Sequence, residues 1–153
     1  MNKKGFTLIE LLAVFVLIAI LSGLAIPNVI SSINNSRKNT FLLDAKRMVS
    51  KSEYLLSENR EYRTTAKTTG ITFTFNQLNE NGEFATDADG GVFDSSSFVR
   101  VTYSGNKYNY CICVIGASKI ISSSTICNPS TTFGCVSSDN LTGIGVVKNK
   151  NWN

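Results

Sequence analysis

The chain opens with a long apolar stretch, and a mostly polar remainder follows it. Residues 6–26 read FTLIELLAVFVLIAILSGLAI, a run of 21 residues in which Thr7, Glu10 and Ser22 are the polar side chains. As an α-helix this run would extend about 32 Å, at about 1.5 Å per residue. The hydrocarbon core of a bilayer is about 30 Å thick. The pattern therefore predicts a membrane-spanning helix over residues 6–26.

A helical period continues beyond the apolar run. Pro27 removes one backbone hydrogen bond and Gly23 adds local softness, so we expect a kink in this region. After the kink, mostly apolar residues recur at steps of three or four as far as Tyr62. The sequence thus predicts one continuous helix up to Tyr62, whose second half, residues 27–62, is amphipathic and turns one side to a core.

Two later segments alternate between side chains that suit opposite faces of a sheet. Residues 97–104 and 107–116 are rich in aromatic and β-branched side chains, and Gly105-Asn106 separates them. A two-residue connection that begins with glycine is a hairpin turn of the Gly-X type. We therefore expect an antiparallel hairpin here.

The segments around this hairpin give weaker signals. Residues 63–70 are polar and predict a loop, and residues 86–97 predict another. Residues 71–75, ITFTF, fit either a strand or the lead into a short helical turn, and residues 143–149 predict a further strand. A long N-terminal helix packed on a small antiparallel sheet is an α+β plan.

Four cysteines fall within a short polar region and follow the pattern C-x-C-x13-C-x7-C. An even number of clustered cysteines predicts disulfides in an oxidising compartment. Cys111 and Cys113 point to the same face of a strand, and their backbone geometry disfavours a bond between them. Three pairings stay open: 111–127 with 113–135, 111–135 with 113–127, or a local Cys127–Cys135 bridge. A zinc site is the functional alternative, but the usual C-x2-C pairs are missing.

Composition excludes several classes of function. The chain has no histidine, which removes His-based acid–base catalysis and His metal ligands. Its net charge of +4 is spread without a basic run, so we expect no direct contact with nucleic acid. The serines lie outside any nucleophile-elbow context. We expect a protein that is not an enzyme and carries no cofactor.

One acidic loop resembles a cation site. Asp87, Asp89 and Asp94 lie within DADGGVFD, where oxygen ligands alternate near glycines as they do in calcium loops. The spacing of an EF-hand is absent, and no closing glutamate follows. We therefore predict an Asp/Gly turn and no metal, with a calcium loop as the alternative.

Glu10 is the residue that a plain membrane helix leaves unexplained. A secretory signal peptide would have a shorter apolar run without a charge, although Gly23 and Ala25 form a passable cleavage site. A simple anchor would carry the cost of a carboxylate in lipid. A helix N-terminal acid favoured by the macrodipole is a further interpretation of Glu10.

The stretch KKGFTLIELL, residues 3–12, resembles the signature of prepilins, which include type IV pilins, type II secretion pseudopilins and the pilins of DNA-uptake systems. The signature is a short basic leader that ends in glycine, then Phe-Thr-Leu-Ile-Glu and a long apolar helix. Pro27 also matches a proline that many members carry. The resemblance is close over about residues 3–35 and is loose in general plan afterwards.

This resemblance implies a processing step and an assembly role. A membrane-embedded prepilin peptidase would cut between Gly5 and Phe6 on the cytoplasmic side and then methylate the new amine of Phe6. Glu10 would attract the N-terminal amine of a neighbouring subunit during assembly. The calcium alternative also gains from it, because some pseudopilins bind calcium in such a loop.

The resulting prediction is a pilin-like chain in four parts. Residues 1–5 form a leader, 6–26 the membrane and polymerisation helix, 27–62 its amphipathic second half, and 63–153 a β-rich head with a disulfide-tied C-terminal loop. Lys3 and Lys4 favour a cytoplasmic N-terminus, so the head faces outward. By resemblance, partners are other pilin subunits, the peptidase, membrane lipid before assembly, and a membrane platform with its assembly ATPase. An ordinary secreted or single-pass anchored binding protein is the alternative.

Overall fold

The computed structural model describes residues 5–124, 126–132, 134–141 and 146–148. It divides into two compact units, Met1–Ser36 and Arg37–Asn153. We call the first the helical unit and the second the globular unit, and we describe each by itself. The predicted head began at residue 63, whereas the globular unit already includes the last part of the long helix.

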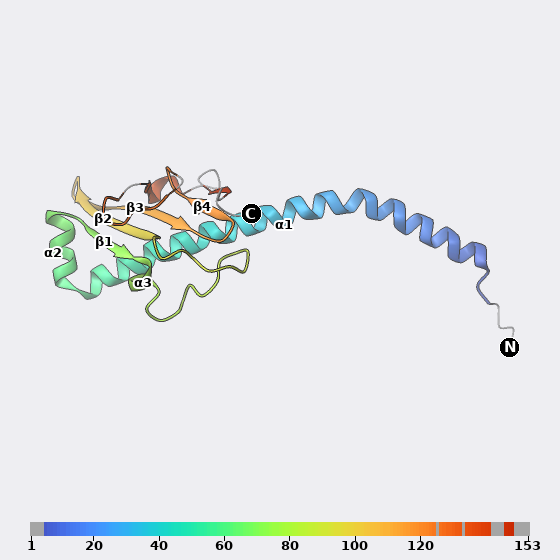
Figure 1. Ribbon diagram of the computed structural model, residues 1–153, viewed down its shortest axis with the longest axis horizontal. Coiled ribbons are helices and arrows are strands. Elements are labelled where there is room, and N and C mark those ends of the chain that lie inside the picture. Colours follow the sequence, from blue (N-terminus) through green and yellow to red (C-terminus); the bar gives the residue numbers. More distant parts are fainter. Residues whose placement is uncertain (1–4, 125, 133, 142–145, 149–153) are drawn as a thin grey trace. The chain divides into compact units, whose positions relative to one another are not determined.

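The helical unit consists of the first part of α1, which spans Leu8–Glu58 (Figure 1). The helix is assigned without interruption through residue 27, and the kink expected at Gly23 and Pro27 stays a prediction. Its large apolar side chains are exposed, for example Leu8 at 85% and Ile33 at 46%. Within the part of the chain that the structure describes, no helix combines the length and apolarity needed to cross a membrane.

The long helix ends earlier than the sequence predicted. α1 stops at Glu58, and Asn59 then caps a separate helix, α2, over Arg60–Thr68. The side chain of Asn59 accepts a hydrogen bond from Glu61 N at 2.8 Å, which is the usual contact of an N-cap residue. The expected loop over residues 63–70 is therefore wrong, because most of that segment is helical.

The turn between the two helices is held by a guanidinium group. Arg63 Nη1 donates to the backbone oxygens of Leu56 and Ser57, at 3.0 and 2.5 Å. The last carbonyls of a helix lack partners within the helix, and a basic side chain can satisfy them. The ring of Tyr62 then packs edge-on against Phe73, with centroids 5.4 Å apart. α2 is thus fixed to the end of α1 and to the sheet.

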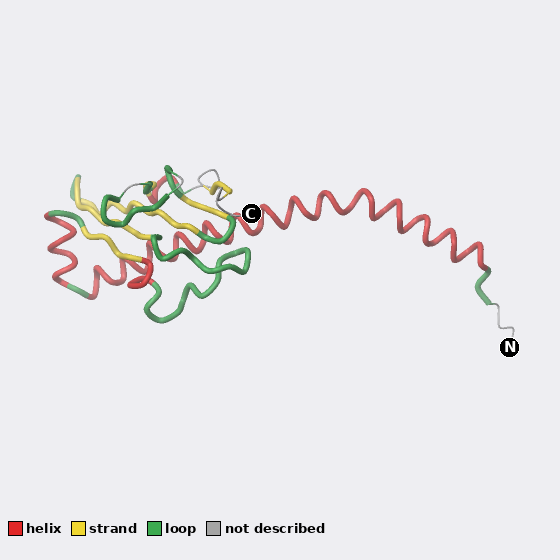
Figure 2. The backbone as a smooth tube through the Cα atoms, viewed as in Figure 1, coloured by secondary structure: helices red, strands yellow, loops and turns green. Residues whose placement is uncertain are grey.

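The sheet is antiparallel and has the order β1-β2-β3-β4-β6, with β5 paired to β3. Figure 2 draws the strands in yellow. Its strands are β1 (Ile71–Thr74), β2 (Phe98–Ser104), β3 (Lys107–Ile115), β4 (Lys119–Ile121), β5 (Val136–Ser137) and β6 (Val146–Lys148). Of the predicted strand over 143–149, residues 143–145 and 149 lie outside the described residues. β4 and β5 share one edge of β3, where β5 pairs with residues 111–112 and β4 with 114–115.

Residues 71–75 were predicted as either a strand or the lead into a helical turn, and the structure contains both. β1 ends at Thr74, and the short helix α3 (Phe75–Leu78) follows at once. Thr74 N donates to Gln77 Oε1 at 2.9 Å, one half of a capping box. The chain therefore leaves the strand through a capped helical turn.

The predicted hairpin is present, with a different turn. Ser104 pairs with Lys107, which leaves Gly105 and Asn106 as the two turn residues. Both have positive φ, 58° and 63°. Two positive φ values are typical of a type I′ turn, whereas the Gly-X type requires only the first. The hydroxyl of Tyr103 donates to Asn106 Oδ1 at 2.8 Å and supports the turn.

The two faces of the sheet have different cores. On one face, β2 and β3 pack against the last part of α1, and the α+β prediction is confirmed. The fully buried apolar side chains of this core include Phe41, Met48, Val99, Val101, Ile112 and Val114. On the opposite face, Phe98 and Cys113 pack with Cys127 in a smaller cluster. Strand alternation therefore separates an aliphatic and aromatic core from a cysteine-based one.

The long loop between α3 and β2 is held by aromatic side chains. Phe93 lies 5.8 Å, centroid to centroid, from both Phe41 and Phe75, and 6.5 Å from Phe84. Phe84 and Phe93 are both buried, at 3% and 5% exposed. The loop is thus an ordered part of the core.

We expect Arg63→Met to lower the free energy of unfolding by about 1 kcal/mol, because two helix-end carbonyls lose a charged donor. Chemical denaturation of the full chain in detergent measures the loss. Arg60→Met is the matched control, since Arg60 lies exposed at the start of the same helix. Equal losses in the two variants would show that Arg63 does not stabilise the turn.

Candidate functional site

The N-terminus of α1 carries a reciprocal pair of hydrogen bonds between Thr7 and Glu10. Thr7 N and Thr7 Oγ1 donate to Glu10 Oε2 at 2.8 and 2.9 Å. In return, Glu10 N donates to Thr7 Oγ1 at 3.3 Å. This is a capping box, in which a threonine and a glutamate three residues later satisfy each other's backbone donors. The carboxylate is therefore turned back toward the helix start.

Sequence reasoning missed Thr7 as a partner of Glu10. The motif T-x-x-E before an apolar run is the usual signal of a capping box, and TLIE in this chain fits it. From the sequence we predict for Glu10 only the role of a helix N-terminal acid or of the partner of a neighbouring subunit's amine. The structure instead gives Glu10 two donors from Thr7.

Gly5 and Phe6 lie directly before this capping box. Both are exposed, and residue Phe6 is 88% exposed. Phe6 N is one residue away from the Thr7 amide that already contacts the Glu10 carboxylate. A free amine created at Phe6 would therefore lie one residue before the Thr7 amide that contacts the Glu10 carboxylate of the same chain.

Apolar side chains surround the helix that follows. The exposed ones within the helical unit include Leu8, Ile9, Leu11, Leu12, Val14, Phe15, Val16, Leu17, Ile18, Ile20, Leu21, Ile26, Val29, Ile30 and Ile33. A helix that is apolar on all sides requires an apolar environment, and large exposed apolar patches mark interaction sites. The helical unit therefore needs cover from lipid or from other protein.

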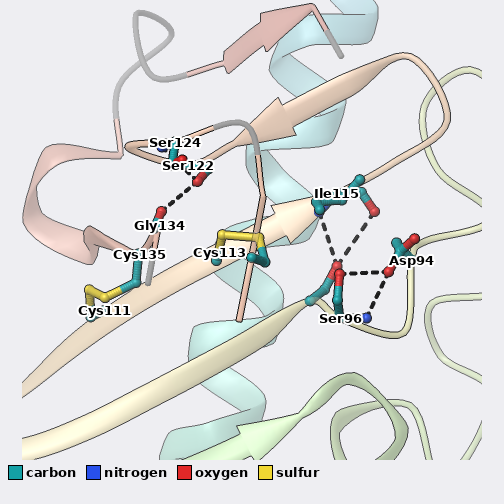
Figure 3. Close-up of a disulfide and its surroundings, with 11 residues drawn as sticks. Asp94, Ser96, Cys111, Cys113, Ile115, Ser122, Ser124, Gly134 and Cys135 are labelled. Atoms are coloured by element: carbon teal, nitrogen blue, oxygen red, sulfur yellow. Dashed lines mark hydrogen bonds between the residues drawn. A yellow bond between two sulfur atoms is a disulfide. The ribbon is translucent and has the colours of Figure 1, made fainter. Parts of the chain in front are cut away.

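The four cysteines form two nested disulfides, Cys111–Cys135 and Cys113–Cys127 (Figure 3). This is one of the three pairings that the sequence left open. The Cα atoms lie 5.4 and 5.7 Å apart, within the normal range. All four cysteines are thus bonded as disulfides, and the zinc alternative is wrong for this structure.

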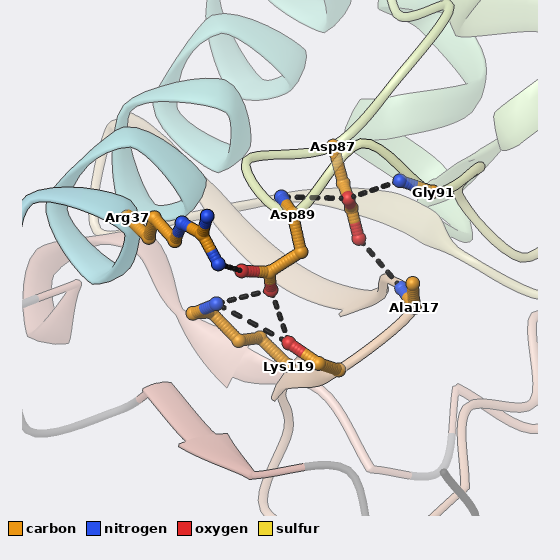
Figure 4. Close-up of polar contacts among 7 residues, drawn as sticks. Arg37, Asp87, Asp89, Gly91, Ala117 and Lys119 are labelled. Carbon is orange, nitrogen blue, oxygen red and sulfur yellow. Dashed lines mark hydrogen bonds and ion pairs between the residues drawn. The ribbon is translucent and has the colours of Figure 1, made fainter. Parts of the chain in front are cut away.

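Asp87 organises the acidic loop from within. It is 6% exposed, and its Oδ1 accepts from Asp89 N and Gly91 N, both at 2.9 Å (Figure 4). Its Oδ2 accepts from Ala117 N at 2.6 Å. A Cβ at Gly116 would lie 2.5 Å from this oxygen, so the glycine permits the close approach. Oδ1 of Asp87 therefore stabilises the loop internally, and Oδ2 fixes the loop to the β3–β4 turn.

Asp89 faces two cationic side chains. Its Oδ2 accepts from Lys119 Nζ and Ser118 Oγ, and its Oδ1 lies 3.6 Å from Arg37 Nη1 (Figure 4). Burial by itself would raise the pKa of Asp89, but the bonds from Lys119 and Ser118 and the nearby positive charges hold this pKa below its ordinary value. The carboxylate therefore joins α1, the acidic loop and β4 as an ion.

Asp94 is not brought to the other two aspartates. Its Oδ1 accepts from Ser96 N and Ser96 Oγ, at 2.8 and 2.6 Å (Figure 3). Among the described residues, no three histidine, cysteine or acidic side chains are grouped as metal ligands would be. The acidic loop is thus a turn that is fixed by its own aspartates, and the carboxylate of Asp89 is paired with Lys119.

Comparison with known proteins finds one match. Residues 1–26 match the family described as the prokaryotic N-terminal methylation motif. The chain therefore carries the prepilin-type motif of type IV pilins and pseudopilins, which are structural subunits. No curated protein and no solved structure matches the chain.

The Asp89 site predicts a dependence of stability on pH. A lowered pKa in the folded state contributes stability above the pKa of the unfolded state, about 3.9, and this stability fades as the pH falls through the folded value. Asp89→Asn should therefore lower the free energy of unfolding by about 2 kcal/mol at pH 7 and by less below pH 4 or so.

Unfolding of the full chain in detergent across this pH range tests the prediction. Asp94→Asn serves as the control, since an amide oxygen still accepts from Ser96 and the loss at pH 7 should be small. A loss for Asp89→Asn that does not change with pH would contradict the ionic role.

Proposed function

We propose that this chain is a structural subunit, a pilin or pseudopilin, of a type IV pilus-like filament that serves adhesion or motility, protein secretion or DNA uptake. The observation that carries the proposal is the methylation motif over residues 1–26, with Glu10 at the start of the helix. The proposed role is structural, and the chain is the substrate of a processing enzyme.

In this proposal a prepilin peptidase cuts between Gly5 and Phe6 and methylates the Phe6 amine. Exposure of both residues before the first helical turn supports access to this bond. Cleavage removes Lys3 and Lys4 and leaves a single positive charge at the new N-terminus. The mature chain would then begin with a cation at Phe6, four residues before Glu10.

Assembly follows from the electrostatics of Glu10 in lipid. An acidic residue costs about 2.5–3.5 kcal/mol on insertion scales at the centre of a spanning helix, and less near the end of the helix, where Glu10 lies. A paired carboxylate costs less than a lone one. The amine of Phe6 in a neighbouring subunit offers such a pair, so charge pairing would set the register of helices in the filament.

The same proposal assigns residues 6–26 to the membrane before assembly and to the filament interior afterwards. It rests on the motif and on the apolar side chains of the helical unit, which need cover. Lys3 and Lys4 would keep the N-terminus cytoplasmic, and the disulfides fit an outward-facing globular unit. Further partners are other pilin subunits, a membrane platform and an assembly ATPase.

Mass spectrometry of the mature chain tests the processing step. We expect a first residue Phe6 that carries one added methyl group, with residues 1–5 absent. A start at Ile26 would instead indicate a signal peptide, and an intact Met1 an ordinary anchored binding protein. Either result would rule out the proposed processing.

Filament formation tests the charge of Glu10. Glu10→Gln keeps an oxygen that can accept from Thr7 but removes the charge, so we expect filaments to be lost, as in Glu10→Ala. Glu53→Ala, which removes an exposed acid of the globular unit, should assemble normally. Normal filaments from Glu10→Gln would show that capping, and not charge pairing, is what Glu10 contributes. Electron microscopy and sheared-filament yield measure the outcome.

A further inference from the structure

The disulfides of this chain are nested: the bond Cys111–Cys135 encloses the bond Cys113–Cys127 in sequence. We propose that the chain reaches this pairing through thiol–disulfide exchange, as a substrate of a disulfide isomerase, because the non-native bond Cys127–Cys135 forms more readily in the unfolded chain. The proposal concerns the making of the globular unit and does not depend on filament assembly.

Loop closure favours the wrong bond. Native partners are separated by 14 and 24 residues, whereas Cys127 and Cys135 lie only eight residues apart. Closure probability falls with about the 3/2 power of loop length. The Cys127–Cys135 loop should therefore close about twofold more often than the Cys113–Cys127 loop, and about fivefold more often than the Cys111–Cys135 loop. Asn128-Pro129 also favours a turn inside it.

This single wrong bond blocks both native ones. Cys127 belongs to one native disulfide and Cys135 to the other, so their bond removes one partner from each pair. The cysteines left over are Cys111 and Cys113. They lie two residues apart on one face of β3, where a direct bond is disfavoured. The mispaired molecule therefore cannot complete its oxidation natively without breaking a bond.

The native pairing depends on contacts that exist only in the folded sheet. Cys135 reaches Cys111 because β5 pairs with β3, with Cys111 opposite Ser137. The carbonyl of Gly134 also accepts from Ser122 Oγ at 2.6 Å (Figure 3), and it accepts from Ser123 N at 2.8 Å. These bonds hold the residue next to Cys135 against the end of β4. Before β3 and β4 form, these contacts are absent and do not oppose closure of the Cys127–Cys135 loop.

Burial then protects the inner native bond. Cys113 is fully buried and Cys127 is 8% exposed, packed with Phe98. Thiol–disulfide exchange requires access of the attacking thiolate to a sulfur atom. An exchange catalyst therefore reaches the open, mispaired chain but not the inner native disulfide, so exchange runs toward the native pairing.

The exchange is balanced in atoms and electrons. A thiolate of the isomerase attacks the Cys127 sulfur, which breaks the Cys127–Cys135 bond and releases Cys135 as a thiolate. The thiolate of Cys113 then attacks Cys127 in this mixed disulfide and releases the isomerase thiolate, with no net change in oxidation state. Cys111 and Cys135 afterwards lose two electrons and two protons to a disulfide oxidant and form the outer bond.

Trapping of one-disulfide species tests the proposal. The full chain, reduced and unfolded in detergent with denaturant, is diluted into diamide, an oxidant that carries no free thiol, and is alkylated at short times. Peptide mapping should find Cys127–Cys135 about twofold more abundant than Cys113–Cys127. In a parallel sample that is not alkylated, removal of diamide followed by addition of a purified, reduced disulfide isomerase should convert this species to the native pair. A predominance of Cys113–Cys127 from the first time point would overturn the proposal.

Two variants separate mispairing from slow folding. Cys111→Ser keeps the wrong partner Cys135, so its yield of Cys113–Cys127 should rise severalfold with the isomerase. Adding Cys135→Ser removes that partner, and the yield should then be the same with and without the isomerase. Equal isomerase dependence in the two variants, or none in either, would contradict the proposal. The ratio of early one-disulfide species in the full chain is set by loop closure before folding, so it tests the proposal even where a variant folds poorly.

Discussion

The alternation of side chains along β3 is the constraint on which the globular unit depends. Ile112 and Val114 point into the core beneath α1, while Cys111 and Cys113 point to the opposite face and form the disulfides. A slip of one residue would exchange these faces, since side chains alternate with a period of two. The type I′ turn of the β2–β3 hairpin fixes the register and so protects both faces at once.

The two faces are stabilised by different means. On the helix face, fully buried aromatic and aliphatic side chains supply the hydrophobic stabilisation, at about 25 cal/mol per Å² of apolar surface. The segment over the other face is rich in serine and threonine, so it has little apolar surface to bury. Each disulfide contributes about 2–4 kcal/mol, mainly by restricting the unfolded chain. Covalent bonds thus replace a core that this segment cannot form.

The sequence was informative where one local pattern decides the outcome. Periodicity predicted the long helix and the hairpin, and the T-x-x-E pattern of TLIE is the local signal of the capping box at the start of α1. The sequence did not predict the end of α1, because residues 60–68 also have a helical pattern. The turn between α1 and α2 depends on the Asn59 cap and on Arg63, which donates to a carbonyl at the end of α1. The disulfide pairing and the partners of Asp89 depend on which segments meet across the sheet, and no local pattern contains that information.

The capping box changes what the charge of Glu10 has to achieve. A carboxylate that already accepts from Thr7 N and Thr7 Oγ1 is not a bare charge, so its cost in an apolar environment is lower than that of an unpartnered acid. A neighbour's amine must therefore offer more than these two neutral donors do. The bonds from Thr7 are already charge-assisted, because their acceptor is an ionised carboxylate. An amine adds the Coulomb attraction of a full opposite charge, which is large in a low-dielectric environment, and that difference favours the amine. In the proposed assembly, Thr7 would hold the carboxylate in place until a cleaved subunit provides the stronger partner.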